Sequence, residues 1–215
     1  KDINVEKVWN DNDNQDGIRP ECVEVQLLGN GEVVDTVTLS TENNWKNTWK
    51  DLDVNKSGEA VEYTVKEASV DGYTTDISYN SESNTFTITN THEVSKKDIN
   101  VEKVWNDNDN QDGIRPESIT VKLYVKGLVD LVEKGVAVLS NSTNWTYTWT
   151  DLDIFAAGKE IIYEIVEDSV AGYYSDIIVD EESNIFKISN THEVLKKDIT
   201  VEKVWNDNDN QDGIR

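Results

Sequence analysis

The chain has 215 residues, with 43 acidic against 20 basic side chains and a formal net charge of -23. This charge makes nucleic acid and anionic membrane poor partners on electrostatic grounds and makes divalent cations better ones, so we expect no binding to nucleic acid. With only two prolines and 8% aromatic residues, the composition indicates folded domains and not a disordered stalk. No apolar run has transmembrane length, so we expect no membrane insertion by this part of the protein.

A long segment is repeated along the chain. KDINVEKVWNDNDNQDGIR begins at Lys1, returns unchanged at Lys97 and begins again at Lys197, with Thr200 in place of Asn4. Such repetition predicts tandem domains, with one repeat over 1–96, a second over 97–196 and the start of a third over 197–215. We expect the parent protein to contain a longer array. The link between the repeats lacks glycine and proline, which predicts that neighbouring repeats of the chain form a semi-rigid rod.

Short stretches of alternating apolar and polar residues follow one another through the first repeat. This period-2 pattern predicts strands, and turn-forming pairs such as Asp16-Gly17 and Asp71-Gly72 separate them. No window shows a helical period, so each repeat is predicted to be an all-β sandwich of six or seven strands. The expected strands of the first repeat are Ile3 to Trp9, Val23 to Leu28, Val33 to Leu39, Val61 to Glu67, Tyr73 to Tyr79 and Thr85 to Thr91.

The second repeat follows the same plan with four extra residues between Lys122 and Ser140. We place this insertion in the connection between two strands, where extra residues are tolerated. The single cysteine, Cys22, is matched by Ser118, which excludes a structural disulfide and a metal-thiolate site and leaves the role of Cys22 open. An acidic, methionine-free and nearly cysteine-free array is typical of a bacterial surface protein.

Three polar residues of the first repeat fall on the core-facing side of their strands. Residues two apart in a strand share a face, so Lys7 points the same way as Val5 and Trp9. The same parity places Glu67 and Asn90 among apolar neighbours of their own strands. Lys103, Glu167 and Asn190 occupy the corresponding positions of the second repeat. Buried lysine and glutamate are rare unless paired, because desolvating a charge costs several kcal/mol, roughly.

Two interpretations of these residues stay open from parity alone. One is a buried salt bridge beside an asparagine, or partly exposed strand ends. The other is a reaction, because a buried pair can exist as a neutral amine and a neutral acid, and a neutral amine is a nucleophile. The acid would polarise the asparagine carbonyl and carry protons while ammonia leaves, which would give a Lys-Asn isopeptide bond.

Several ordered motifs of the chain resemble a known family. VEKVWNDNDNQDGIRP, NNWKNTW with DLD, YTVKE, GY and the closing ITNTH are similar to the B-type repeats of Gram-positive collagen adhesins and to related pilin domains. The resemblance covers both repeats and the third copy. It implies tandem immunoglobulin-like sandwiches of reverse topology, each with an intramolecular Lys-Asn isopeptide bond promoted by an acidic residue.

The resemblance also assigns roles to individual residues. It makes Lys7 with Asn90, and Lys103 with Asn190, the cross-linked pairs, and it makes Glu67 and Glu167 the catalytic acids. The second repeat reads YEIVE and ISNTH at the matching motifs and keeps the reactive residue types. Lys203 has no such glutamate or asparagine after it within 197–215, so we expect it to remain an unreacted nucleophile.

The loop DNDNQDG is rich in oxygen ligands of the kind that calcium prefers. Its spacing departs from the EF-hand pattern and it lacks a closing glutamate, so a solvated turn is the alternative. No cofactor is required by the cross-linking chemistry, and calcium is the one candidate ion. The candidate ligands are Asp11, Asp13 and Asp16 in the first repeat and Asp107, Asp109 and Asp112 in the second.

The tryptophans and histidines have structural interpretations as well as functional ones. Trp9, Trp45 and Trp49 could stack on carbohydrate, but we predict core positions, with Trp9 keeping the lysine site dry. His92 and His192 are predicted to be strand-end residues, because no serine or cysteine nucleophile accompanies them consistently.

Together these features predict a structural stalk of a secreted, cell-surface adhesin, anchored to the cell wall in its full-length parent. A host matrix ligand would be bound by another region. The alternative is that the repeats themselves bind a matrix protein or a glycan. A turnover enzyme is not expected, since the reaction would occur once in each domain.

Overall fold

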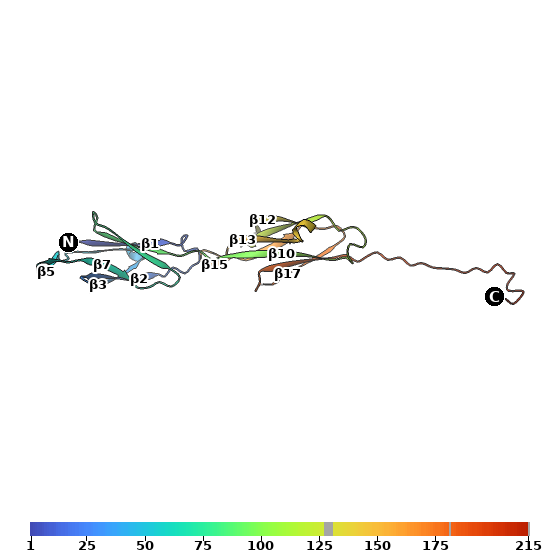
Figure 1. Cartoon of the computed structure of the whole chain (residues 1–215), viewed down its shortest axis with the longest axis horizontal. Helices are drawn as coiled ribbons and strands as arrows, with labels where there is room; N and C mark the ends of the chain where they lie inside the picture. The colour runs from blue at the N-terminus through green and yellow to red at the C-terminus, as the bar shows by residue number, and fades with distance from the viewer. Residues whose placement is uncertain (127–130, 181, 215) are drawn as a thin grey trace. The chain divides into compact units, whose positions relative to one another are not determined.

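The structure is a computed structural model that describes residues 1–126, 131–180 and 182–214 (Figure 1). The first repeat contains two larger sheets, a two-stranded hairpin and one short 3₁₀ turn, η1 (Thr41–Asn43). One sheet has the order β4-β1-β9-β8, with bounds Lys46–Trp49, Ile3–Asn10, Thr85–Thr91 and Thr74–Asn80. The other has the order β3-β2-β7, with bounds Glu32–Ser40, Cys22–Gly29 and Tyr63–Glu67. The hairpin pairs β5 (Asn55–Lys56) with β6 (Glu59–Ala60).

The second repeat has the same arrangement. Its four-stranded sheet has the order β13-β10-β18-β17, with bounds Thr146–Asp153, Lys96–Asn106, Ile185–Thr191 and Tyr174–Asp180. Its three-stranded sheet has the order β12-β11-β16, with bounds Leu131–Ser140, Ser118–Lys126 and Tyr163–Glu167. The remaining elements are the hairpin β14 (Phe155–Ala156) with β15 (Lys159–Glu160) and the 3₁₀ turn η2 (Asn141–Thr143).

The predicted all-β sandwich is confirmed, with differences in detail. Each expected strand of the first repeat has a counterpart, but the fourth, expected from Val61, begins at Tyr63. The sequence pattern missed β4 and the β5–β6 hairpin, which are too short to show an alternation. In the second repeat, the strands flanking the four-residue insertion are β11 and β12, and the connection predicted to carry it, 127–130, lies outside the described residues.

The first and last strands of each repeat are neighbours. β1 pairs with β9 in parallel, with Lys7 opposite Ile88 and Trp9 opposite Asn90. β10 pairs with β18 in the same register, with Lys103 opposite Ile188. A parallel pair cannot be joined by a tight turn, so the rest of each sandwich lies between these two strands in sequence.

The core is formed by one face of each strand. Along β1, Ile3, Val5 and Lys7 are buried while Val8 is 38% exposed. In β9, Phe86, Ile88 and Asn90 are all buried. Each fully buried aliphatic side chain stabilises the fold by about 1.5–3 kcal/mol relative to an exposed one. The side of the strand on which they lie therefore places Lys7 and Asn90 in an apolar interior.

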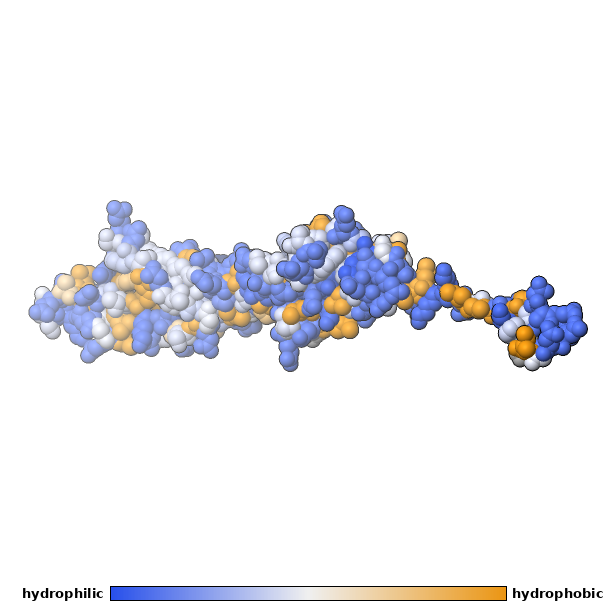
Figure 2. All heavy atoms as spheres, turned by 45° about the vertical axis from the view of Figure 1, so that its right-hand side comes forward, coloured by the Kyte–Doolittle hydropathy of each residue, from blue (hydrophilic) through white to orange (hydrophobic). Residues whose placement is uncertain are grey.

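The third copy of the repeated segment has no strand in its described residues, 197–214. Its apolar side chains are exposed, with Val201 at 87% and Trp205 at 51%, and Figure 2 shows apolar spheres along this segment. Residues Asn208 to Asn210 nevertheless keep the positive φ angles that the same loop has in the two complete repeats. The loop conformation is therefore local, whereas the strand depends on its sheet partners. None of the described helices has the length and hydropathy of a transmembrane span.

Candidate functional site

A buried lysine and a buried glutamate meet in the interior of the first repeat. Lys7 Nζ lies 3.1 Å from Glu67 Oε1, and the two side chains are 0% and 2% exposed. β1 and β7 belong to different sheets, so this contact spans the sandwich. Each ion removed from water in this way loses several kcal/mol of solvation, roughly, and only the attraction to its partner offsets that loss.

Asn90 completes the group. It lies on β9, next to β1, on the same buried face, and its exposed fraction is 0%. Neither polar atom of its side chain has a hydrogen-bond partner among the residues that the structure describes. An unpartnered buried amide costs about 1–3 kcal/mol, so a fold that retains one here carries a polar group that its packing does not explain.

The second repeat has the same group with closer contacts. Lys103 Nζ lies 2.7 Å from Glu167 Oε1, again with side chains 0% and 2% exposed. Asn190 is fully buried, and its Nδ2 donates a hydrogen bond of 3.1 Å to the same glutamate oxygen. Strand parity had therefore isolated three residues that the fold places together in each repeat.

Aromatic rings cover the lysine. Lys7 Nζ lies 4.3 Å from the centroid of the Trp9 ring, and Trp9 makes edge-to-face contacts with Trp45 and Tyr73 at 5.2 and 5.0 Å. Burial lowers the pKa of Lys7 below the ordinary lysine value, although the adjacent carboxylate opposes the change. Lys103 has a lowered pKa for the same reason. Desolvation thus favours the neutral, nucleophilic amine in both repeats.

A hydroxyl group contacts each glutamate from an edge strand, and sequence reasoning missed it. Thr75 Oγ1 donates a hydrogen bond of 3.1 Å to Glu67 Oε2. In the second repeat, Ser175 Oγ donates to Glu167 Oε2 over 2.7 Å. The sequence does contain a signal for this contact, because the aligned residues Thr75 and Ser175 both carry a hydroxyl group.

The DNDNQDG loop does not gather its carboxylates into a metal site. Asp11, 2% exposed, accepts hydrogen bonds from Arg19 Nε at 2.9 Å, Tyr73 Oη at 2.8 Å and the Asn14 N–H at 3.0 Å. The hydrogen bonds from Arg19 lower the pKa of Asp11 to about 2 despite its burial. Asp107 is bound in the same way by Arg115 and Tyr173. The carboxylates of Asp11 and Asp107 are therefore already paired with an arginine and accept further hydrogen bonds from a tyrosine.

The other loop carboxylates point to different surroundings. Asp16 Oδ2 lies 3.0 Å from His92 Nε2 and accepts the Ser95 N–H at 2.7 Å, and Asp112 is bound likewise by His192 and the Leu195 N–H. Asp13 and Asp109 are exposed. The described part of the chain contains no cluster of three or more histidine, cysteine or acidic side chains able to hold a metal. The calcium site stays a prediction, and the solvated-turn alternative is wrong for Asp11 and Asp16, which are buried.

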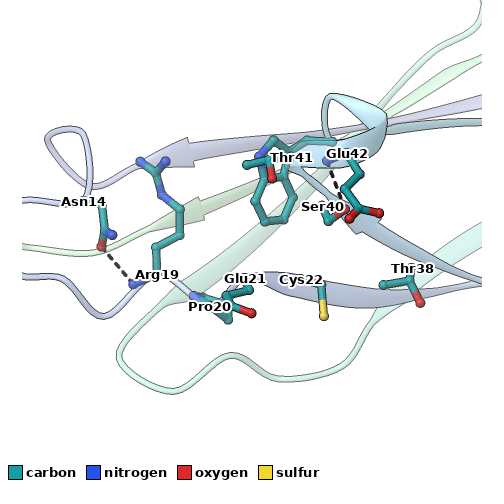
Figure 3. A pocket seen from close by; sticks show the side chains of 10 residues that line it. Asn14, Arg19, Pro20, Glu21, Cys22, Thr38, Ser40, Thr41 and Glu42 are labelled. Carbon is teal, nitrogen blue, oxygen red and sulfur yellow. Dashed lines mark hydrogen bonds between the residues drawn. The ribbon is translucent and has the colours of Figure 1, made fainter.

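The remaining candidates are placed away from this chemistry. Lys203 is exposed and lies 4.7 Å from the centroid of the Trp205 ring. Trp49 is a core residue, 5% exposed, as predicted. Cys22 is exposed in an open groove of the first repeat that Arg19, Trp45 and Glu42 also line (Figure 3).

Comparison with known proteins places this chain in a family. Residues 3–91 and 99–191 each match the family described as the Cna protein B-type domain. The chain is 44% identical over 214 residues to a collagen adhesin of Staphylococcus aureus, spanning 99% of this chain and 17% of that protein's length.

Two solved structures are among those similar to this chain in sequence. A single B repeat unit of the collagen binding surface protein of S. aureus is 41% identical, with 89% of this chain and 98% of that chain covered and a TM-score of 0.42. The two-repeat structure of that protein is also 41% identical, with 90% and 49% covered and a TM-score of 0.42.

The fold and the site thus define a pair of β-sandwich domains whose adjacent first and last strands carry a buried lysine and a buried asparagine beside a glutamate. The chain belongs to the Cna B-type domain family, and it corresponds to a B-repeat region similar to that of the staphylococcal collagen adhesin.

Proposed function

We propose that each complete repeat forms an intramolecular isopeptide bond, Lys7 to Asn90 and Lys103 to Asn190, and serves as a covalently stapled spacer. The observation that carries this proposal is the buried Lys7–Glu67 contact beside an Asn90 amide that lacks partners among the described residues. A purely structural ion pair would not need the asparagine.

The reaction balances without a cofactor. The lysine proton passes to the glutamate, which leaves a neutral amine and a neutral acid. The amine attacks the asparagine side-chain carbonyl carbon while the acid donates a hydrogen bond to the carbonyl oxygen. A new C–N bond forms, the old one breaks, and the amide nitrogen leaves as ammonia after the glutamate has transferred protons between the two nitrogens.

The orientation of the asparagine amide follows the protonation of the glutamate. Asn190 Nδ2 donates to Glu167 Oε1, which is the arrangement that suits an ionised carboxylate acceptor. Once the glutamate is protonated, it becomes a donor and favours the asparagine Oδ1. Rotation of the amide by half a turn then brings the carbonyl oxygen to the acid, so proton transfer and amide rotation prepare the attack together.

The bond would join strands that lie at opposite ends of each repeat's sequence. Asn90 lies 83 residues after Lys7, and Asn190 lies 87 residues after Lys103. A force that enters through β1 would leave through β9 by way of the bond, and the residues between them would not be extended. Slow unfolding and resistance to proteolysis should follow.

For the whole protein we propose a secreted adhesin, held on the bacterial cell surface, in which these repeats separate a ligand-binding region from the wall. The relationship to a collagen adhesin supports this proposal, and the chain spans 17% of that relative's length. Each domain is its own substrate and reacts once, so we propose no turnover activity. Direct binding of a matrix protein or glycan by the repeats is the second candidate function, and its candidate binding site is the groove that Trp45 lines.

Peptide mapping tests the cross-link itself. After digestion with trypsin, we expect one branched peptide that joins the Lys7 and Asn90 segments and a second that joins those of Lys103 and Asn190. Glu67→Gln should abolish the first branched peptide and leave the second. Linear peptides from both repeats of the unaltered chain would refute the proposal.

A further inference from the structure

Each glutamate of the site has two oxygens with separate neighbours. In the first repeat, Glu67 Oε1 lies against Lys7 Nζ at 3.1 Å, and Oε2 accepts the Thr75 hydroxyl at 3.1 Å. In the second repeat, Glu167 Oε1 lies against Lys103 Nζ at 2.7 Å, and Oε2 accepts the Ser175 hydroxyl at 2.7 Å. In both domains, therefore, Oε1 contacts the lysine and Oε2 accepts the hydroxyl hydrogen bond.

The hydroxyl comes from a strand that is exposed along its whole length. All seven residues of β8 are exposed, whereas the Glu67 side chain is 2% exposed. Thr75 lies directly opposite Asn90 in the antiparallel β8–β9 pair, and Ser175 lies opposite Asn190. The hydroxyl therefore reaches the carboxyl group from the outer edge of the sheet, next to the asparagine that would react.

We propose that Thr75 and Ser175 are positioning residues for isopeptide formation, and this inference rests on the proposed function above. By donating to Oε2, the hydroxyl holds the carboxyl group so that Oε1 alone faces the amine and the amide. The proton that leaves the lysine is then received by the oxygen that must return it to the departing nitrogen.

The chemistry of the two side chains supports this role. Threonine and serine share only the hydroxyl group, which is the atom that contacts the glutamate in each repeat. A hydrogen bond to an ionised group is among the stronger ones in proteins, so it restrains the rotation of the carboxyl group. Without it, either oxygen could take the proton, and fewer encounters would place the acid on the asparagine carbonyl.

The test compares Thr75→Val with Thr75→Ser in the full chain. Valine keeps the shape and strand preference of threonine and removes the donor, whereas serine keeps the donor. Chains are collected shortly after cell-free synthesis, and the loss of ammonia from each repeat is followed by mass spectrometry over a range of pH. The second repeat, left unaltered, is the internal reference.

We expect Thr75→Val to slow bond formation in the first repeat by about tenfold, the factor that one hydrogen bond to a charged group provides. Its pH–rate profile should also change, because the hydroxyl no longer fixes which carboxyl oxygen takes the proton. Thr75→Ser should restore the rate and the pH–rate profile. A merely structural role would change the melting temperature and leave the pH profile in place.

The possible results separate this inference from the proposed function. No ammonia loss from the unaltered chain would overturn the proposed function. Ammonia loss from the unaltered chain, together with an unchanged rate and pH profile in Thr75→Val, would overturn only the positioning role. If Thr75→Val fails to fold, Ser175→Ala in the second repeat decides the question by the same measurements, with the first repeat as reference.

Discussion

Removing the amide that Lys7 would attack should remove most of the extra stability of the first repeat. Asn90→Ala leaves the Lys7–Glu67 contact in place and deletes the carbonyl carbon that the bond requires. The proposed bond closes a loop whose ends are 83 residues apart. The chain-entropy expression developed for disulfides gives about 4.5 kcal/mol for a loop of that length. For a domain of this size, such a loss lowers the melting temperature by roughly 20 to 30 °C.

A double-mutant cycle separates the bond from the local effect of the alanine. Lys7→Arg keeps a cation beside Glu67 and removes the nucleophile, so it also prevents the bond. In the Lys7→Arg background, Asn90→Ala should cost only its local effect, about 1 kcal/mol or less. The coupling energy of the cycle should therefore approach 4.5 kcal/mol, the value of the cross-link.

Calorimetry provides the assay, because the two repeats can be followed in one chain. The transition of the first repeat should fall in Asn90→Ala, while that of the second repeat stays where it is and serves as the reference. Asn190→Ala should reverse the pattern. If the two single changes and the double change in the first repeat are additive, Lys7 and Asn90 act independently and the reasoning is refuted.

Other predictions concern the surroundings of the site. Asp11→Asn should lower the free energy of unfolding by about 2 kcal/mol at neutral pH, because the folded protein lowers the pKa of Asp11 to about 2. In urea titrations, this loss of stability should be fully present above the ordinary pKa of 3.8 and should vanish as the pH falls through about 2. The contact with Asp16 raises the pKa of His92. The loss of stability in His92→Gln should therefore be complete below about pH 6.5 and disappear as the pH rises through the higher pKa of the folded state. A loss of stability that does not depend on pH would contradict the role of the charged His92–Asp16 pair. Trp9→Ala should admit water to Lys7 and slow the loss of ammonia in newly made protein, and an unchanged rate would show that the ring is not needed to keep the site dry. Lys203→Ala should leave the number of ammonia molecules lost unchanged, and any reduction would show that the third copy reacts.

The burial of the three polar residues could be predicted because a strand has a period of two. Lys7, Glu67 and Asn90 all share parity with buried neighbours, and their burial in the structure confirms that part of the reasoning. The family to which the chain belongs was also predicted from its motifs. The sequence also suggested that the lysine and the glutamate are paired, and the structure shows this contact between strands of two different sheets.

The positioning hydroxyl could not be predicted by the same method. β8 is exposed on both faces, so alternation carries no information about which of its residues turns inward. The role of Thr75 depends on the register between β8 and β9, which the sequence pattern does not specify.

The loop was misjudged for a related reason. Its polar composition is typical of a solvated turn, but Tyr73, 62 residues later in the chain, and Arg19 bury Asp11. Three consecutive residues with positive φ, Asn12 to Asn14, place the Asn14 N–H on that carboxylate. Asparagine and aspartate tolerate this backbone conformation, so the loop shape follows from local sequence while the burial does not.

Intact-mass spectrometry of the purified chain tests the central claim most directly. Each Lys-Asn bond releases one ammonia, so the account predicts a mass lower than the calculated value by two ammonia molecules, one for each complete repeat. Glu67→Gln should return one of them. The full calculated mass for the unaltered, folded chain would contradict the claim that these buried groups form covalent bonds.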